Sequence, residues 1–177
     1  IIEKISGMSY YDYIKKYVYE PAAMVNSDCY DISNVVENLA VGYTKGAPMG
    51  RSFKEWHNNL GSHPLKGGPA GGGYSTVEDL LNFDIALRSG KLLSAENFML
   101  MTSGKVARNA QTQYAYLFQE KFVNGQRIIG HNGGAGGINS HLAMYMDLGY
   151  TVAIMANYDP PAAEKIAAKL EELLTGK

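Results

Sequence analysis

Two glycine clusters, at residues 67–73 and 133–137, are the first places where this sequence could do chemistry. Glycine-rich loops can cradle phosphates, but neither cluster continues into the Gly-Lys-Ser/Thr of a P-loop. Their glycines also do not fit the spacing of the dinucleotide fingerprint. The Gly-x-Ser-x-Gly turn that presents a nucleophile in α/β-hydrolases does not occur in the sequence. The glycines therefore need another explanation than these three sites.

The histidines and the cysteine do not predict a metal site. His57 and His63 are near each other, and His131 and His141 lie downstream, but no His-x-x-x-His pair occurs. A protein zinc site needs three or four convergent ligands, so hydrogen-bonded or surface histidines are the favoured interpretation and we expect no metal. Cys29 is alone, which excludes an internal disulfide and a thiolate zinc cluster, and it does not indicate a compartment.

Two stretches together resemble the β-lactamase-related serine hydrolase family, which includes penicillin-binding proteins, DD-peptidases and esterases. The first is Pro-Ala-Gly-Gly-Gly-Tyr-Ser-Thr-Val-Glu-Asp-Leu at residues 69–80. The second is Gly-His-Asn-Gly-Gly-Ala-Gly-Gly-Ile-Asn-Ser at residues 130–140, whose first five residues resemble Gly-His-x-Gly-Gly at the start of the family's third active-site motif. Weaker similarity at residues 2–21 and 149–157 extends the resemblance over nearly the whole chain.

The resemblance implies an active site of three parts, of which this chain holds one. The family uses Ser-x-x-Lys, then Tyr-x-Asn or Ser-x-Asn, then Lys-Thr-Gly or His-x-Gly. None of the serines precedes a lysine by three residues, and no tyrosine or serine precedes an asparagine by two. Thr102 does precede Lys105 by three, but Ser103-Gly104 would break the helix that must present both groups. The interpretation is therefore a C-terminal portion of a serine hydrolase, with the N-terminal part of the parent domain missing.

The surviving motif gives the candidate site residues. By the resemblance His131, Gly133 and Gly134 belong to the catalytic, oxyanion side, with the Gly134 N–H as one oxyanion donor, and Asn132 and Gly133 contact the substrate. A histidine replaces the lysine of lactamases, and imidazoles are mostly neutral at pH 7. This favours a small ester, amide or peptide substrate over a lactam. The alternative for His131 is a residue that only ends a strand, and the alternative for the protein is a non-catalytic binding or scaffold relative.

The elements before residue 112 are predicted to be helices and loops. Residues 1–7 are typical of a helix that ends at Gly7, and Ser9 opens the next helix, which Pro21 ends. Residues 22–68 show no sustained period and predict a long irregular segment with short helices. Ser75 is expected to cap a helix that buries Val77, Leu80, Leu81 and Leu87, and Ser94 a shorter one that ends near Thr102.

The residues after 113 are predicted to form an antiparallel meander and a final helix. Strands are expected at residues 116–123, 126–130, 138–146 and 150–157, with the Asn124-Gly125 turn between the first two. Asp159-Pro160-Pro161 is expected to open a final helix. The apolar residues on one side of this helix are Ile166, Leu170, Leu173 and Leu174.

The fold class is therefore α+β, as in the C-terminal part of the β-lactamase/transpeptidase-like fold, and residues 1–177 form a single partial domain. Residues 1–112 are its mainly helical and loop region, and residues 113–177 hold the strands and the last helix. The 46% hydrophobic content suits a packed core, and the net charge of −1 excludes a basic surface for nucleic acid. We expect no cofactor and no transmembrane segment. An unpaired sheet edge predicts self-association.

Overall fold

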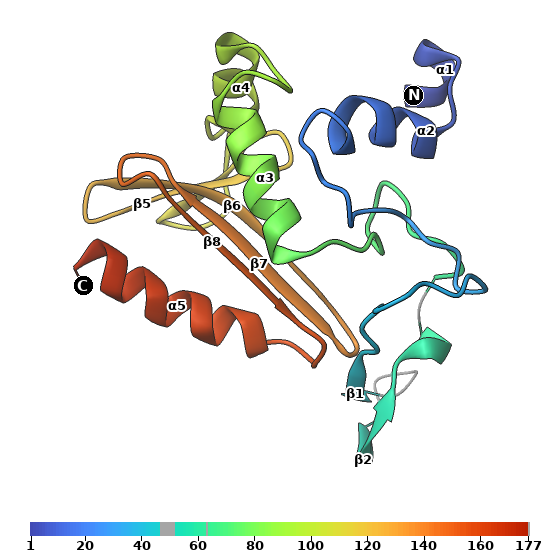
Figure 1. Cartoon of the computed structure of the whole chain (residues 1–177). Coiled ribbons are helices and arrows are strands. Elements are labelled where there is room, and N and C mark those ends of the chain that lie inside the picture. The colour runs from blue at the N-terminus through green and yellow to red at the C-terminus, as the bar shows by residue number, and fades with distance from the viewer. Residues whose placement is uncertain (47–51, 63, 177) are drawn as a thin grey trace.

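The computed structural model of the chain describes residues 1–46, 52–62 and 64–176, and its main feature is a six-stranded antiparallel sheet. Strands adjacent in sequence are also adjacent in the sheet, so the expected meander is confirmed, but two unexpected strands precede the four expected ones, and the strand expected at residues 116–123 begins at Gln119. Helices cover both faces of this sheet, which confirms the α+β class (Figure 1). From one edge to the other, the strands are β3 (Val106–Ala107), β4 (Thr112–Tyr114), β5 (Gln119–Val123), β6 (Gln126–Ala135), β7 (Ile138–Tyr145) and β8 (Tyr150–Ala156).

Two apolar cores hold the helices against the sheet. The helices α3 (Val77–Arg88) and α4 (Ala95–Thr102) lie on one face, and α5 (Ala162–Thr175) runs along the other (Figure 1). Because side chains of a strand alternate between faces, Ile129 is buried on the side of α3 and α4, and Ile128 on the α5 side. The first core adds the buried residues Leu87, Phe98, Phe118 and Met144, and the second adds Ala143 and Tyr145.

The N-terminal helices follow the expected start and stop signals. The helix α1 (Ile2–Ser6) ends at Gly7, whose φ of 69° is the left-handed conformation that glycine adopts at low cost. The hydroxyl of Ser9 accepts a hydrogen bond from the Asp12 N–H at 3.1 Å and caps α2 (Tyr10–Ile14). The segment then continues as the π-helix η1 (Lys15–Tyr19), shortly before Pro21.

The expectation of an irregular segment at residues 22–68 was wrong at one place. A two-stranded antiparallel sheet, β1 (Tyr43–Gly46) with β2 (Ser52–Asn58), precedes the short 3₁₀ helix η3 (Leu60–Ser62). Every residue of β2 is exposed, so the strand has no buried face that an alternation of apolar and polar residues would reveal in the sequence. Tertiary contacts stabilise the pair: the Asp159 carboxylate accepts from the Lys45 N–H at 2.8 Å, and the Trp56 ring packs on Tyr158. His63 lies outside the described residues.

Three other local expectations need correction. The N-cap of α3 is Thr76 rather than Ser75, and its hydroxyl accepts from the Asp79 N–H at 3.1 Å. The residue before α5 is Pro161, because the Asp159 carboxylate is used by Lys45 and Gly137 instead of the helix. Two of the expected stripes are also partly exposed, at Val77 and Leu81 on α3 and at Ile166 and Leu173 on α5.

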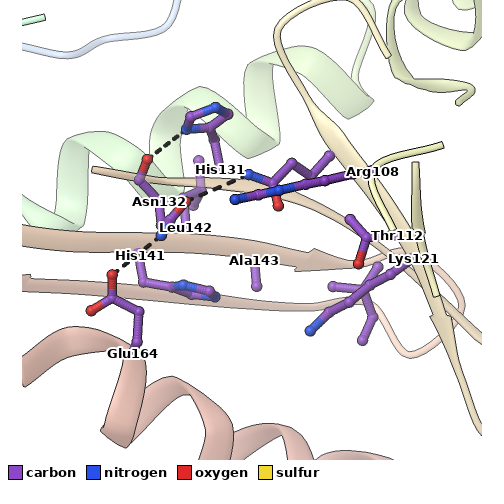
Figure 2. Close-up of a pocket in the computed structure, with 12 residues that line it drawn as sticks. Arg108, Thr112, Lys121, His131, Asn132, His141, Leu142, Ala143 and Glu164 are labelled. Carbon is purple, nitrogen blue, oxygen red and sulfur yellow. Dashed lines mark hydrogen bonds between the residues drawn. The ribbon is translucent and has the colours of Figure 1, made fainter. Parts of the chain in front are cut away.

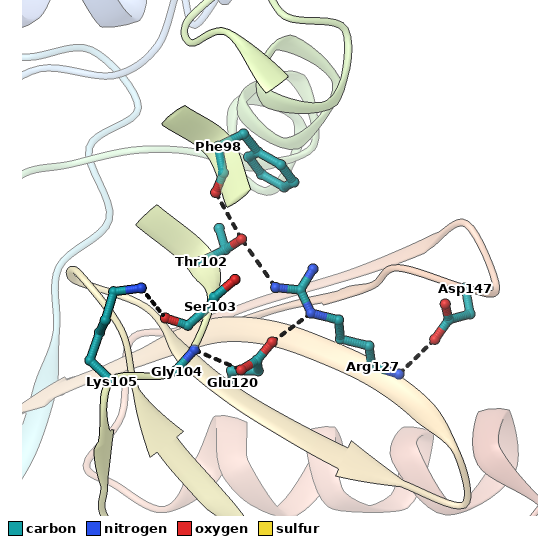
Figure 3. A network of polar contacts seen from close by, with 8 residues as sticks. All are labelled: Phe98, Thr102, Ser103, Gly104, Lys105, Glu120, Arg127 and Asp147. Atoms are coloured by element: carbon teal, nitrogen blue, oxygen red, sulfur yellow. Dashed lines mark hydrogen bonds and ion pairs between the residues drawn. The ribbon is translucent and has the colours of Figure 1, made fainter. Parts of the chain in front are cut away.

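A part-buried ionic network ties α4 to the sheet (Figure 3). The carboxylate of Glu120 accepts from Arg127 Nε at 2.6 Å and from the Gly104 N–H at 2.7 Å. Arg127 also donates through Nη2 to the hydroxyl of Thr102 at 3.2 Å, and that hydroxyl donates to the Phe98 carbonyl at 2.8 Å. Thr102 is therefore fully buried in a structural network, in agreement with its rejection as a nucleophile.

The variant Glu120→Gln should lower the free energy of unfolding by about 2 kcal/mol, because it removes the charge that holds both Arg127 and the Gly104 N–H. Urea unfolding measures this change. The control Lys169→Gln breaks the exposed pair with Glu172 and should cost less than about 0.5 kcal/mol. Equal losses in the two variants would contradict the structural role of the network.

Candidate functional site

The four site residues predicted from sequence lie together on β6, where the strand changes from two neighbours to one. The pairing between β5 and β6 ends with Gln119 opposite Gly130. From His131 to Ala135 the strand pairs with β7 alone among the described residues. This stretch therefore forms an edge where an extended ligand could reach the backbone.

His131 is exposed at the start of this edge, and both of its ring nitrogens have neighbours. Its Nδ1 lies 2.6 Å from the carbonyl oxygen of Asn132, and its Nε2 lies 3.3 Å from the hydroxyl of Tyr114 on β4. A carbonyl oxygen can only accept, so Nδ1 carries a proton in this arrangement. The imidazole is exposed, and the contacts at its two ring nitrogens hold it at the edge of the sheet.

Asn132 points to the α5 face, away from the core that Ile129 enters. Its Nδ2 donates to Glu164 on α5 at 3.2 Å, and its Oδ1 accepts from Gln119 Nε2 at 3.5 Å (Figure 2). These contacts fix the peptide that separates His131 from Gly133. Substrate contact by Asn132 stays a prediction.

Asn139 on β7 is completely buried, and its side chain connects the same edge to α5. Its Nδ2 donates to the Gly133 carbonyl at 3.0 Å, and its Oδ1 accepts from the Ala163 N–H in the first turn of α5 at 2.7 Å. One side chain therefore sets the distance between the glycine strand and α5.

The glycines of β6 are required by crowding rather than by turns. A Cβ on Gly130 would lie 2.0 Å from the Leu142 carbonyl oxygen, which is backbone and cannot move aside. A Cβ on Gly134 would lie 2.7 Å from Pro160 Cγ, and one on Gly133 would lie 2.8 Å from Ser140 Oγ. At Gly130 the missing side chain allows close approach of the neighbouring backbone, whereas at Gly134 and Gly133 it leaves room for the side chains of Pro160 and Ser140.

One cavity adjoins the edge, and a second hollow lies beside β7 and β8. The first, of about 150 Å³, lies beside His131 and Asn132, and His141, Lys121, Arg108 and Glu164 also line it (Figure 2). The second, larger hollow of about 670 Å³ is lined by both sequence stretches that carry the family resemblance, through residues 72–76 and 137–140. The larger hollow has room for a further protein segment or a substrate, whereas the smaller one holds at most a small polar group.

The electrostatics of the site come from His141 and Glu164. Burial and then the nearby Lys121 hold the pKa of His141 below its usual value, so neutral imidazole is favoured. Burial alone would raise the pKa of Glu164. Hydrogen bonds, from the Asn139 and Asn132 side chains among others, outweigh burial and lower it. The α5 face therefore keeps a carboxylate beside a neutral imidazole.

The thiol of Cys29 and the candidate metal ligands bear on two further kinds of chemistry, a reactive thiolate and a metal site. Cys29 is buried, and burial followed by the charge of Asp28 raises the pKa of its thiol, which disfavours a reactive thiolate. Within residues 1–46, 52–62 and 64–176, no group of three or more His, Cys, Asp or Glu side chains is placed to hold a metal ion. No helix in those ranges has the length and apolar character needed to cross a membrane.

Sequence reasoning did not find Tyr114, Gln119 or Glu164 as parts of the site. The available signal was register: Tyr114 pairs with Gln119, and Gln119 with Gly130, so the side chains of Tyr114 and Gln119 lie on one face of the sheet, next to position 130. That register required the exact limits of β4 and β5, which short strands do not reveal in sequence.

The fold and the β6 edge place the chain in the class of proteins related to β-lactamases and penicillin-binding proteins. A profile of the Beta-lactamase family matches residues 1–177, and the chain belongs to this family. The resemblance drawn from the two glycine-bearing stretches is thereby confirmed.

Three relatives give the extent of the similarity. The chain is 26% identical over 190 residues to Penicillin-binding protein 4* of Bacillus subtilis (strain 168), with 100% of the chain and 42% of that protein covered. A crystal structure of a penicillin binding protein from Bacillus halodurans superposes with a TM-score of 0.87 at 26% identity, over 97% of this chain and 52% of that one. The octameric penicillin-binding protein homologue from Pyrococcus abyssi gives a TM-score of 0.78 at 26% identity, over 99% and 40%. The chain thus spans about half the length of these relatives or less.

The variant Gly134→Ala should lower the free energy of unfolding by about 1–3 kcal/mol, because its methyl group would overlap Pro160. In the double variant with Pro160→Ala part of this loss should be recovered, and a double-mutant cycle of urea unfolding measures the coupling. Gly61→Ala is the matched control, since a Cβ there meets nothing within 4 Å. Strictly additive effects at positions 134 and 160 would show that the crowding is absent.

Stability should fall when the pH is lowered through the titration range of His141. Because its pKa in the folded chain lies below the unfolded value of about 6.5, the unfolded chain takes up a proton that the folded chain resists. Unfolding free energies measured at about pH 7.5 and about pH 5.5 should therefore differ less in His141→Gln than in the wild type. An unchanged difference would mean that His141 titrates alike in both states.

Proposed function

We propose that this chain supplies the oxyanion side of a serine hydrolase that works through an acyl-enzyme. The nucleophile would come from a Ser-x-x-Lys segment outside residues 1–177, since the sequence contains none. The substrate would be a small ester, amide or peptide, bound with its carbonyl group against β6. The backbone N–H of Gly134 would then be one of the donors to the developing oxyanion.

The observation that carries this proposal is the one-sided edge of β6 from His131 to Ala135. Acyl transfer needs donors fixed in advance at the position where negative charge develops, and a backbone held by a neighbouring strand meets that need. Gly133 and Gly134 leave the edge without side chains, so a carbonyl group can approach the backbone closely.

The nature of residue 131 supports esters, amides or peptides over lactams that carry a carboxylate. A lysine at this position would place a fixed positive charge at the edge, whereas an imidazole is mostly neutral at pH 7. Both ring nitrogens of His131 have hydrogen-bond partners in the structure: Nδ1 contacts the Asn132 carbonyl, and Nε2 contacts the Tyr114 hydroxyl. The side chain of residue 131 therefore attracts a substrate carboxylate less strongly than a lysine at this position would.

Two surfaces support the proposal that further protein completes the site. The strand β8 has β7 as its one neighbour in the described part of the sheet. On α3, Val77, Leu81 and Ile85 form an exposed apolar row at four-residue spacing, and they are about half exposed. Such surfaces are normally covered, either by more of the same polypeptide or by a second copy. We propose the first as the functional arrangement and self-association as the behaviour of the chain alone.

A fluorophosphonate probe tests the proposal. The 177-residue chain should not be acylated, while a polypeptide extended upstream to include a Ser-x-x-Lys segment should be labelled at that serine. In the extended polypeptide His131→Ala should slow labelling by about 10²-fold, because it removes the side chain that borders the reacting group. Mass spectrometry of the intact protein gives both the extent and the rate of labelling.

Two outcomes would contradict the proposal. Stoichiometric labelling of the 177-residue chain would place a nucleophile inside it. An extended polypeptide that is never labelled would favour a non-catalytic binding relative. The variant His57→Ala, on the exposed strand β2, is the control and should leave the rate unchanged.

A further inference from the structure

Tyr114 lies next to His131 although the two residues come from different strands. Tyr114 belongs to β4 and His131 to β6, with β5 between them in the sheet. Beyond Gln119 no strand in the described ranges follows the edge of β6, so the His131 ring can turn over the end of β5. The Tyr114 hydroxyl and His131 Nε2 are 3.3 Å apart, and the two rings meet edge to face with centroids 6.1 Å apart.

We infer that Tyr114 is a positioning residue for His131 in the proposed reaction: its hydroxyl donates to Nε2 and fixes the orientation and the tautomer of the imidazole. The inference rests on the proposed function for its role in catalysis. The hydrogen-bond arrangement itself rests on geometry alone.

The donors and acceptors of the two side chains assign the protons. Nδ1 of His131 faces a carbonyl oxygen, which only accepts, and therefore Nδ1 is protonated. In the neutral ring Nε2 then holds an electron pair and needs a donor. The Tyr114 oxygen already accepts from Gln119 Nε2 at 3.4 Å, so its own O–H proton is available for Nε2. With this assignment, His131 Nδ1, His131 Nε2 and the Tyr114 hydroxyl each have a hydrogen-bond partner.

Neighbours on both sides hold Tyr114 in place. Gln119 pairs directly with Tyr114 in the β4–β5 register and bridges to the Asn132 side chain at 3.5 Å. The guanidinium group of Arg108 lies 5.5 Å from the centre of the Tyr114 ring, within range of a cation–π contact. The ring is half-buried, so its hydroxyl has few other directions available.

The arrangement also tolerates a change in the charge of His131. If Nε2 takes up a proton, the new N–H donates to the Tyr114 oxygen, which has a second electron pair for this purpose. The tyrosine O–H then rotates away, and no heavy atom needs to move. Tyr114 can therefore keep the ring in one orientation whether or not the imidazole carries a proton during acyl transfer.

The first test is nitrogen-15 NMR of the histidine rings in Tyr114→Phe and in the matched control Tyr116→Phe. Tyr116 lies two residues away and its ring is exposed, with Lys105 over it. In the wild type and in Tyr116→Phe, His131 should show one tautomer, protonated at Nδ1. In Tyr114→Phe the Nε2 resonance should move towards that of a nitrogen without a donor, and the second tautomer should appear. Identical His131 spectra in all three proteins would overturn the inference.

The second test is acylation of the extended polypeptide by the fluorophosphonate probe across pH. Tyr114→Phe should slow acylation by about three- to tenfold, the loss of one hydrogen bond, and should change the pH profile, while Tyr116→Phe should do neither. An altered tautomer with an unaltered acylation rate and pH profile would overturn the positioning role. A wild-type polypeptide that is not acylated at all would instead refute the proposed function, and the NMR result would still decide whether Tyr114 holds the ring.

Discussion

The structure depends on the point at which β5 stops pairing with β6. Up to Gly130 the strand has neighbours on both sides, and this half carries the buried residues Ile128 and Ile129 of the two cores. Beyond that point one side of the backbone is open, and two of the five residues there, Gly133 and Gly134, have no side chain. A rigid first half and an open second half of one strand give an edge that is both accessible and well positioned.

The open half is stabilised mainly from the α5 side of the sheet. Asn139 binds the Gly133 carbonyl and the start of α5, and Glu164 from that helix binds Asn132. Each contact is made by a side chain that is buried or half-buried, where a hydrogen bond is hard to replace by water. The helix therefore acts as a support for the edge, although it lies on the face opposite to α3.

Much of the local structure followed from the sequence because short-range chemistry decides it. Ser9 and Ser94 cap helices as expected, and Asn124 and Gly125 adopt the positive φ values, 48° and 79°, of their turn. The wrong expectations arose where distant contacts decide. Asp159 could have capped α5, but Lys45 and Gly137 recruit its carboxylate.

The candidate site was predictable only where its residues are neighbours in the sequence. The glycines and His131 form one continuous segment, so a resemblance could find them together. Tyr114 and Glu164 reach the segment from another strand and from a helix, and their place depends on register and packing that no local pattern encodes. A sequence can thus identify the strand that carries a site well before it identifies the side chains that hold the strand in place.

The hydrogen bond between Asp159 and Lys45 also has a consequence for the order of folding during synthesis. During synthesis β1 and β2 leave the ribosome before Asp159, because the carboxylate that binds the Lys45 N–H comes 114 residues later in the chain. Until Asp159 has emerged, the two strands are a nascent segment with exposed aromatic rings and without this contact. Contacts of such long sequence separation form late, so this hairpin should be among the last parts to acquire its native position and the most dependent on protection until then.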